Sequence, residues 1–200
     1  MPSALADELA ALVLPQRVEP LIVPWPAPGA PCAFLTFGCL NEWRAFVRAL
    51  DLDPHIPLIV RAKFHRALKL LYLAWIDIDL VKAAELIAMT ALELALTDRF
   101  GGPGRPPSFG SMLKLLVERE GLTDADIPMI VRCGGSAIGR IDGSATPSLR
   151  EIRNSLAHGA PFDGFIHAGL IELARDLIEF AYRSYLAEAI ARGGAIEAQA

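Results

Sequence analysis

The chain has 200 residues, of which 53% are apolar and 21% are charged, and its formal net charge at pH 7 is −4. This length predicts one domain. The negative net charge argues against a general nucleic-acid binder, because the affinity of such proteins rests on basic patches. It is compatible with a small local basic site. The mean hydropathy of +0.37 fits either a membrane protein or a soluble protein that buries apolar surface between subunits.

Run length decides against the membrane interpretation. A spanning helix needs about 20 mostly apolar residues, and the two most apolar stretches are interrupted by Lys69, Asp77 and Asp79 and by Glu85 and Glu93. The N-terminus has acidic rather than basic residues before its apolar run, unlike a signal peptide. We therefore expect a cytoplasmic protein that makes no membrane contact and whose apolar excess lies in an oligomer interface.

The cysteines and histidines show no metal-binding pattern. Cys32, Cys39 and Cys133 are odd in number and form no CxxC, so we expect reduced thiols. The four histidines include no HExxH and no paired spacing. We expect neither a metal nor a cofactor.

The first 50 residues are set apart by their prolines. Residues 3–13 predict a short helix. The proline-rich segment that follows predicts an extended arm, because proline is confined to turns and sheet edges. Short edge strands are expected at Leu21–Val23 and Ala33–Phe37. We favour an arm that extends the core, and the alternative is an arm that docks on a partner subunit.

From Asn41 onward the apolar residues recur at helical spacing. Helices are expected over residues 41–50, after Pro57 and up to residue 100, and the sequence "DID" at 77–79 either breaks or bends the last stretch. After a glycine- and proline-rich loop, Ser108 or Ser111 can cap a helix over 112–121. "CGGSAIGRIDGSAT", residues 133–146, lacks the Lys-Ser/Thr of a phosphate-binding loop and predicts a flexible connection.

Two further helices complete the predicted fold. Thr146-Pro147 are suited to begin a helix that ends before Gly159. A long helix from about residue 165 follows, with an apolar edge of Leu170, Leu173, Leu177, Phe180 or Ala181, and Tyr185. The expected fold class is all-α, an antiparallel helical bundle over residues 51–200 preceded by the proline-rich N-terminal arm of residues 1–50.

The stretch "SLREIRNSLAHG", residues 148–159, places Arg153, Asn154 and His158 on one predicted helix. Asn154 and His158 are four residues apart and face the same way, and Arg153 lies about 140° around the helix from His158. A phosphate over the last turn could therefore contact all three. A second Arg–His pair, Arg48 and His55, is interrupted by Asp-Pro and cannot lie on one helix.

The region around this motif is locally basic. Between residues 132 and 158 there are four arginines and two acids. Arg140 and Arg150 are the candidates for binding RNA phosphates beside Arg153. The alternative for His158 needs no function, because a protonated histidine followed by glycine suits the C-terminal end of a helix.

"LREIRNSLAHG" and the long amphipathic helix after it resemble the HEPN superfamily. These are all-α domains of four or more helices with an R-x(4–6)-H motif in which a polar residue, often Asn, follows the Arg. "YLAWIDIDLVKAAELIAMTALELALTDRFG" is similar to the preceding helices of HEPN proteins from bacterial defence and stress contexts. The resemblance covers residues 57–186, and leaves the first 50 or so outside.

The resemblance implies a dimeric, metal-independent endoribonuclease or RNA-binding, toxin-like effector. Cleavage by the 2′-OH of RNA needs proton transfer, for which histidine is suited, and positive charge against the phosphate, which arginine supplies. By position, Arg153 and His158 are catalytic and Asn154 supports them. Glu93 is either a partner of Arg153 or a bundle salt bridge to another arginine.

RNA, a second copy of the chain and an antitoxin or other protein are the expected partners. The alternative function is a non-catalytic helical dimerisation or interaction module that binds a partner protein or a nucleotide.

Overall fold

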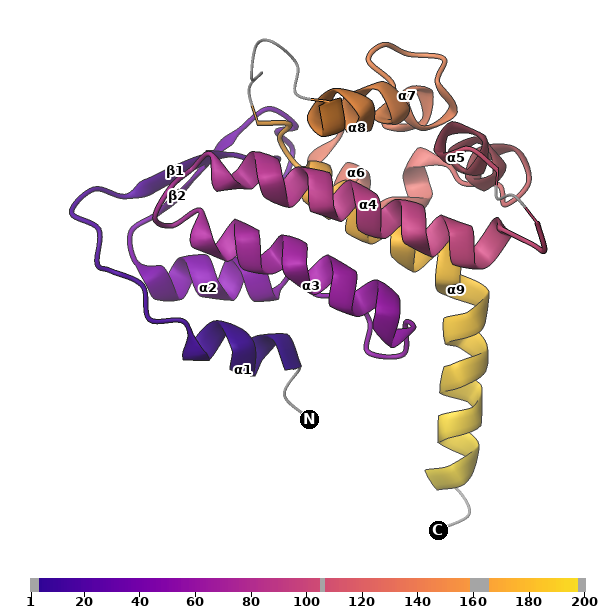
Figure 1. Ribbon diagram of the computed structural model, residues 1–200, viewed down its shortest axis with the longest axis horizontal. Coiled ribbons are helices and arrows are strands. Elements are labelled where there is room, and N and C mark those ends of the chain that lie inside the picture. The colour runs from indigo at the N-terminus through magenta and orange to yellow at the C-terminus, as the bar shows by residue number, and fades with distance from the viewer. Residues whose placement is uncertain (1–3, 105–106, 159–165, 198–200) are drawn as a thin grey trace.

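The computed structural model describes residues 4–104, 107–158 and 166–197. Within these ranges the fold is mostly α-helical and has one two-stranded sheet (Figure 1), which confirms a mainly α class. The elements are α1 Ala4–Ala11, β1 Leu21–Pro24, β2 Phe34–Phe37, α2 Leu40–Arg48, α3 Leu58–Leu73, α4 Leu80–Phe100, α5 Phe109–Glu118, α6 Pro128–Cys133, α7 Ile138–Asp142, α8 Leu149–His158 and α9 Leu170–Glu197, with a 3-10 turn at Asp124–Asp126.

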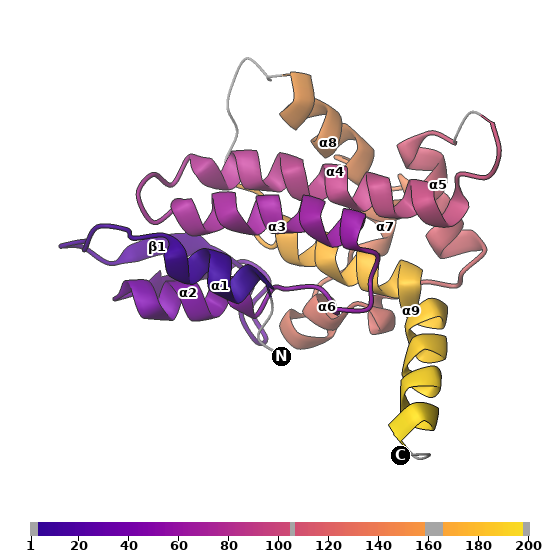
Figure 2. The same ribbon diagram turned by 60° about the horizontal axis from the view of Figure 1, so that its bottom comes forward.

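The centre of the molecule is built from α3, α4 and α9. Helix α4 packs along α3 and along α9 (Figures 1 and 2). Small side chains favour this arrangement, because Ala84, Ala88, Ala91 and Ala95 recur along α4 and are fully buried, which lets neighbouring helices approach closely. In the described ranges no helix has the length and apolar character needed to cross a membrane.

The sequence "DID" breaks the long helical stretch and does not merely bend it. Helix α3 ends at Leu73 and α4 begins at Leu80. In the turn between them the carboxylate of Asp77 accepts the backbone N–H of Asp79 at 3.0 Å, a local bond that competes with helix formation.

The N-terminal segment packs into the same hydrophobic core as the helices. The antiparallel strands β1 and β2 pair Leu21 with Phe37, which confirms the expected edge strands, and α1 and α2 bury Leu9 and Trp43 in that core. The indole N–H of Trp25 donates to Glu172 of α9 at 2.9 Å. The segment therefore extends the core of the helical part.

The connection between α5 and α8 is more ordered than the sequence predicts. It contains α6, and α7 lies inside the stretch "CGGSAIGRIDGSAT" that predicted a flexible connection. The carboxylate of Asp124 accepts the backbone N–H groups of Ala137 and Ile138, at 2.8 and 3.3 Å. It thereby satisfies two donors at the start of α7 that the helix itself leaves free.

Several predicted helix boundaries are also corrected. Helix α8 begins after Ser148 and not at Thr146-Pro147, because Ser148 and Glu151 form a reciprocal capping box: the Ser148 hydroxyl accepts from the Glu151 N–H and the Glu151 carboxylate accepts from the Ser148 N–H. Helix α5 is capped by Ser108. The predicted helix stop at Gly159 lies outside the described residues.

The last helix begins at Leu170 and not near residue 165. Gly169, just before it, has a φ of +78°, outside the helical range. Of the two residues considered for its apolar edge, Ala181 is buried and Phe180 is partly buried against the core, whereas Tyr185 is exposed.

Candidate functional site

Helix α8 carries the Arg153–His158 motif and lies across α4 (Figures 1 and 2). Two side chains anchor it, since Leu149 and Ile152 are buried in the core. The capping box at Ser148 and Glu151 fixes its N-terminal end. The opposite face exposes Arg150 and, at the last position of the helix, His158.

Arg153 is held by two neighbours. Its guanidinium donates from Nη2 to the Glu93 carboxylate on α4 and from Nη1 to the Asn154 side-chain oxygen at 3.1 Å. The side chains of Arg153 and Glu93 are 26% and 28% exposed. Of the two roles considered for Glu93, the structure shows the pair with Arg153. The Nε of Arg153 is buried without a hydrogen-bond partner among the described residues.

His158 is exposed at the C-terminal end of α8, one turn beyond Asn154. Among the described residues no hydrogen bond or ion pair restrains its ring. An exposed imidazole is accessible to a ligand and can transfer a proton near neutral pH. The same position is also where a helix dipole favours a protonated histidine.

The other predicted phosphate contacts are not gathered around this motif. Arg150 lines a cavity of about 240 Å³ together with Lys114 and Ser108. Arg140, on α7, lines a different cavity of about 270 Å³ beside Leu149. Arg140 and Arg150 thus line two different cavities, and neither Arg153 nor His158 lines either of them.

The local basic surplus is smaller than the sequence suggests, because two of the four arginines are paired with carboxylates. Arg132 donates from both terminal nitrogens to Glu172 of α9, at 2.8 and 2.9 Å, and Arg153 pairs with Glu93. Burial would raise the pKa of Glu172, but its hydrogen bonds from Arg132 and Trp25 outweigh burial and hold the pKa below its usual value.

The described residues contain no group of three or more histidine, cysteine, aspartate or glutamate side chains that could hold a metal ion. The side chains of Arg153, Asn154 and His158 can transfer a proton through the imidazole and bind an anion through the guanidinium and the amide.

A second constellation, which the sequence did not predict, lies at the 270 Å³ cavity. Glu85 of α4 is 1% exposed, and its carboxylate accepts the backbone N–H of His167 at 2.7 Å. The His167 Nδ1 lies 3.6 Å from the other carboxylate oxygen. Burial raises the pKa of Glu85, although His167 and Lys82 oppose the shift. These two residues are 82 positions apart, so no local motif could have joined them.

The chain offers one signal for this pair. Glu85 follows Ala84 and stands one turn from Ala88 and Met89, all of which are buried. An acid on the buried face of a helix is almost always paired, so the periodicity of α4 indicates that Glu85 has a polar partner without naming it.

Comparison of the chain with protein-family models, with curated proteins and with solved structures finds no match.

Proposed function

We propose that the protein is a HEPN-like, metal-independent endoribonuclease or RNA-binding effector that acts as a homodimer in defence or stress responses. One observation carries the proposal. Arg153 is held in place by Glu93 and Asn154, and an exposed His158 stands one turn beyond Asn154 on the same helix. A fixed guanidinium and an exposed imidazole on one helix are the minimum needed to bind a phosphodiester and move a proton at it.

In the proposed reaction the 2′-OH of RNA attacks the adjacent phosphorus, and the 5′-oxygen of the next nucleotide leaves. The products are a 2′,3′-cyclic phosphate and a 5′-OH. His158 accepts or donates a proton, and Arg153 stabilises the charge on the phosphorane oxygens. One chain supplies one such histidine, so His158 of a second copy provides the other proton-transfer group. Glu93 is a positioning residue, because it acts through Arg153.

A second candidate function is a non-catalytic interaction module that binds a partner protein, such as an antitoxin, or a nucleotide. The ion pair with Glu93 favours it, because this pair already neutralises the charge of Arg153. His158 also has a purely structural explanation at a helix end. Both functions use α8, but only the ribonuclease requires His158 for turnover.

An RNA digest with purified protein separates the two functions. We expect His158→Ala to slow cleavage by about 10²–10⁴ and Arg153→Ala by about 10²–10³. The matched controls are His55→Ala and Arg48→Ala, which alter the other Arg–His pair. Arg48 ends α2, and His55 lies in the following turn beside Asp53. Equal activity of all four variants, or no cleavage by the wild type, would reject the ribonuclease.

The ends of the fragments test the mechanism independently of the rates. Cyclic phosphate and 5′-OH ends are expected, because the 2′-OH is the nucleophile. Fragments with 5′-phosphate ends would show that water attacks instead, and the assignment of His158 would then fail.

A further inference from the structure

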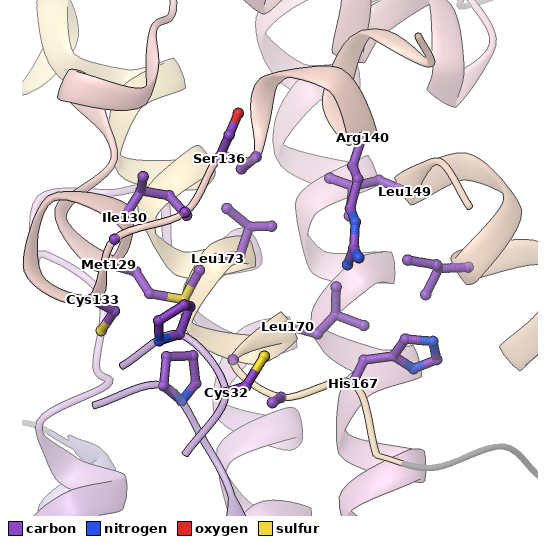
Figure 3. Close-up of a pocket in the computed structure, with 18 residues that line it drawn as sticks. Cys32, Met129, Ile130, Cys133, Ser136, Arg140, Leu149, His167, Leu170 and Leu173 are labelled. Carbon is purple, nitrogen blue, oxygen red and sulfur yellow. The ribbon is translucent and has the colours of Figure 1, made fainter. Parts of the chain in front are cut away.

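The cavity beside Glu85 and His167 has the construction of a small-molecule site. It is lined by residues of α6, α7, α8 and the start of α9 (Figure 3), and by Pro26 and Pro31 of the proline-rich arm. Its volume of about 270 Å³ is near the lower end of ligand-binding pockets. It is therefore suited to a ligand of about ten non-hydrogen atoms.

Gly169 allows the cavity wall to close. A Cβ at this position would lie 2.7 Å from the Pro26 ring and 2.8 Å from the Met129 sulfur. The absence of a side chain lets the arm and α6 meet at the N-terminal end of α9. The wall is thus formed by close packing of three segments that are distant in the sequence.

The cavity is mostly apolar, and among the described residues one arginine, the exposed Arg140, lines it. Leu149, Leu170, Leu173 and Met129 supply apolar walls. Figure 3 shows the Arg140 side chain extending from α7 with its guanidinium directed toward Leu170. Among the described residues the Arg140 side chain has no hydrogen bond or ion pair; only its backbone N–H donates, to the carbonyl of Ala137. A guanidinium beside an apolar wall is a geometry that binds the head of an amphipathic anion.

The charge of the surroundings limits the ligand to a single negative charge. Behind His167 lies Glu85, whose Oε2 is buried and has no hydrogen-bond partner among the described residues. Arg140 is the only arginine or lysine among the described residues that line the cavity, so it can compensate one negative charge of a ligand but not two. A monoanion is neutralised by Arg140, and the half-exposed His167 ring is available for a further hydrogen bond.

We propose that this cavity binds a small amphipathic monocarboxylate, with its carboxylate on Arg140 and its alkyl or aryl part against Leu149, Leu170 and Leu173. This inference does not depend on the proposed ribonuclease function, because neither Arg153 nor His158 contributes to the cavity. Binding can be measured in the absence of RNA.

The proposal can be tested by titrating the full chain with octanoate in an isothermal titration calorimeter. A ligand of this size is expected to bind with a Kd of about 0.1–1 mM. Octanol, which has the same chain but no charge, should bind at least about tenfold more weakly, and Arg140→Gln should weaken octanoate by about tenfold or more. Arg66→Gln, which removes an exposed arginine on α3, should leave the affinity unchanged.

The cysteines provide a second measurement that locates the ligand. Cys32 is exposed and lines the cavity, whereas Cys39 is exposed and does not. Octanoate should slow alkylation of Cys32 and leave Cys39 unaffected, as mapped by peptide mass spectrometry. The proposal is overturned by an absence of octanoate binding at several times the expected Kd, by equal binding of octanol, by unchanged affinity in Arg140→Gln, or by unprotected Cys32.

Discussion

The ion pair between Glu93 and Arg153 can be tested by a double-mutant cycle of Glu93→Ala, Arg153→Ala and the double variant. Both side chains are about three-quarters buried, with exposures of 28% and 26%. The pair thus lies between exposed pairs, which contribute up to about 1 kcal/mol, and fully buried pairs, whose disruption costs about 3–5 kcal/mol. We expect a coupling free energy of about 1–2 kcal/mol.

Urea unfolding of the four proteins gives this coupling directly, because it compares the sum of the single effects with the double effect. For a chain of this size, each kcal/mol of lost stability lowers Tm by about 2–4 °C. A loss of about 1–2 kcal/mol should therefore lower the Tm of each single variant by about 2–8 °C. Glu93→Ala should be the more damaging single change, since it leaves the Arg153 charge partly buried without its partner.

A control pair is available between α1 and α3. Lys69 and Glu8 approach to 2.8 Å but are 37% and 45% exposed, so their coupling should stay below about 1 kcal/mol. If the Glu93–Arg153 coupling is within about 0.3 kcal/mol of zero, Arg153 is not held by Glu93 in solution. The observation that carries the proposed function would then be lost.

The remaining predictions concern assembly, metal, packing and pH. Light scattering should give twice the chain mass of 21.6 kDa, and a monomer at micromolar concentration would remove the composite site. Cleavage should survive EDTA; loss that magnesium or manganese restores would reject the mechanism. Gly169→Ala should cost about 2–4 kcal/mol in urea unfolding, from a positive φ and a clash, whereas Gly143→Ala shares the positive φ but has nothing within 4 Å and should cost about 1–2 kcal/mol. Burial raises the pKa of Glu85, so the folded state loses stability as pH rises from the ordinary value of 4.5 through the raised pKa. Glu85→Gln should therefore raise Tm at neutral pH but change it little near pH 4. A Tm shift of the same size at both pH values would contradict this.

Most of the helical fold could be predicted from the sequence, because long elements repeat their pattern many times. Helices α3 and α4 show several turns of apolar residues, and the arm's strands are bounded by prolines. Helices α6 and α7 have only six and five residues, too few for a period to be recognised. The start of α7 is stabilised by Asp124, 13 residues before Ala137, which no local pattern indicates.

The start of α8 was mispredicted although its signal is local. Ser148 and Glu151 form the S-x-x-E pattern of a capping box. Thr146-Pro147 offered a competing start two residues earlier, and only the observed hydrogen bonds distinguish the two. An error of this size is ordinary at helix ends and leaves Arg153 and His158 on the same helix.

In the candidate site, too, contacts between residues close in the sequence could be predicted, and contacts between distant residues could not. Arg153, Asn154 and His158 lie within six residues, so helical geometry alone relates them. The contact with Glu93, 60 residues away, depends on how α8 crosses α4. From the sequence alone, Glu93 could pair either with Arg153 or with another arginine of the bundle. Arg140 was grouped with the motif by charge, but it belongs to α7, an unpredicted helix that directs it into another cavity.

Helices α4 and α8 join the two sites described above. On α4, Glu85 and Glu93 are eight residues apart, about 12 Å along the axis; the first faces the cavity through His167 and the second holds Arg153. On α8, Leu149 and Ile152 line the cavity, and the next residue is Arg153. Ile152 and Arg153 are neighbours in α8, so a ligand that shifted this helix would shift both. Coupling between two sites requires a physical connection, and α8 is the helix that both lines the cavity and carries the arginine that Glu93 holds.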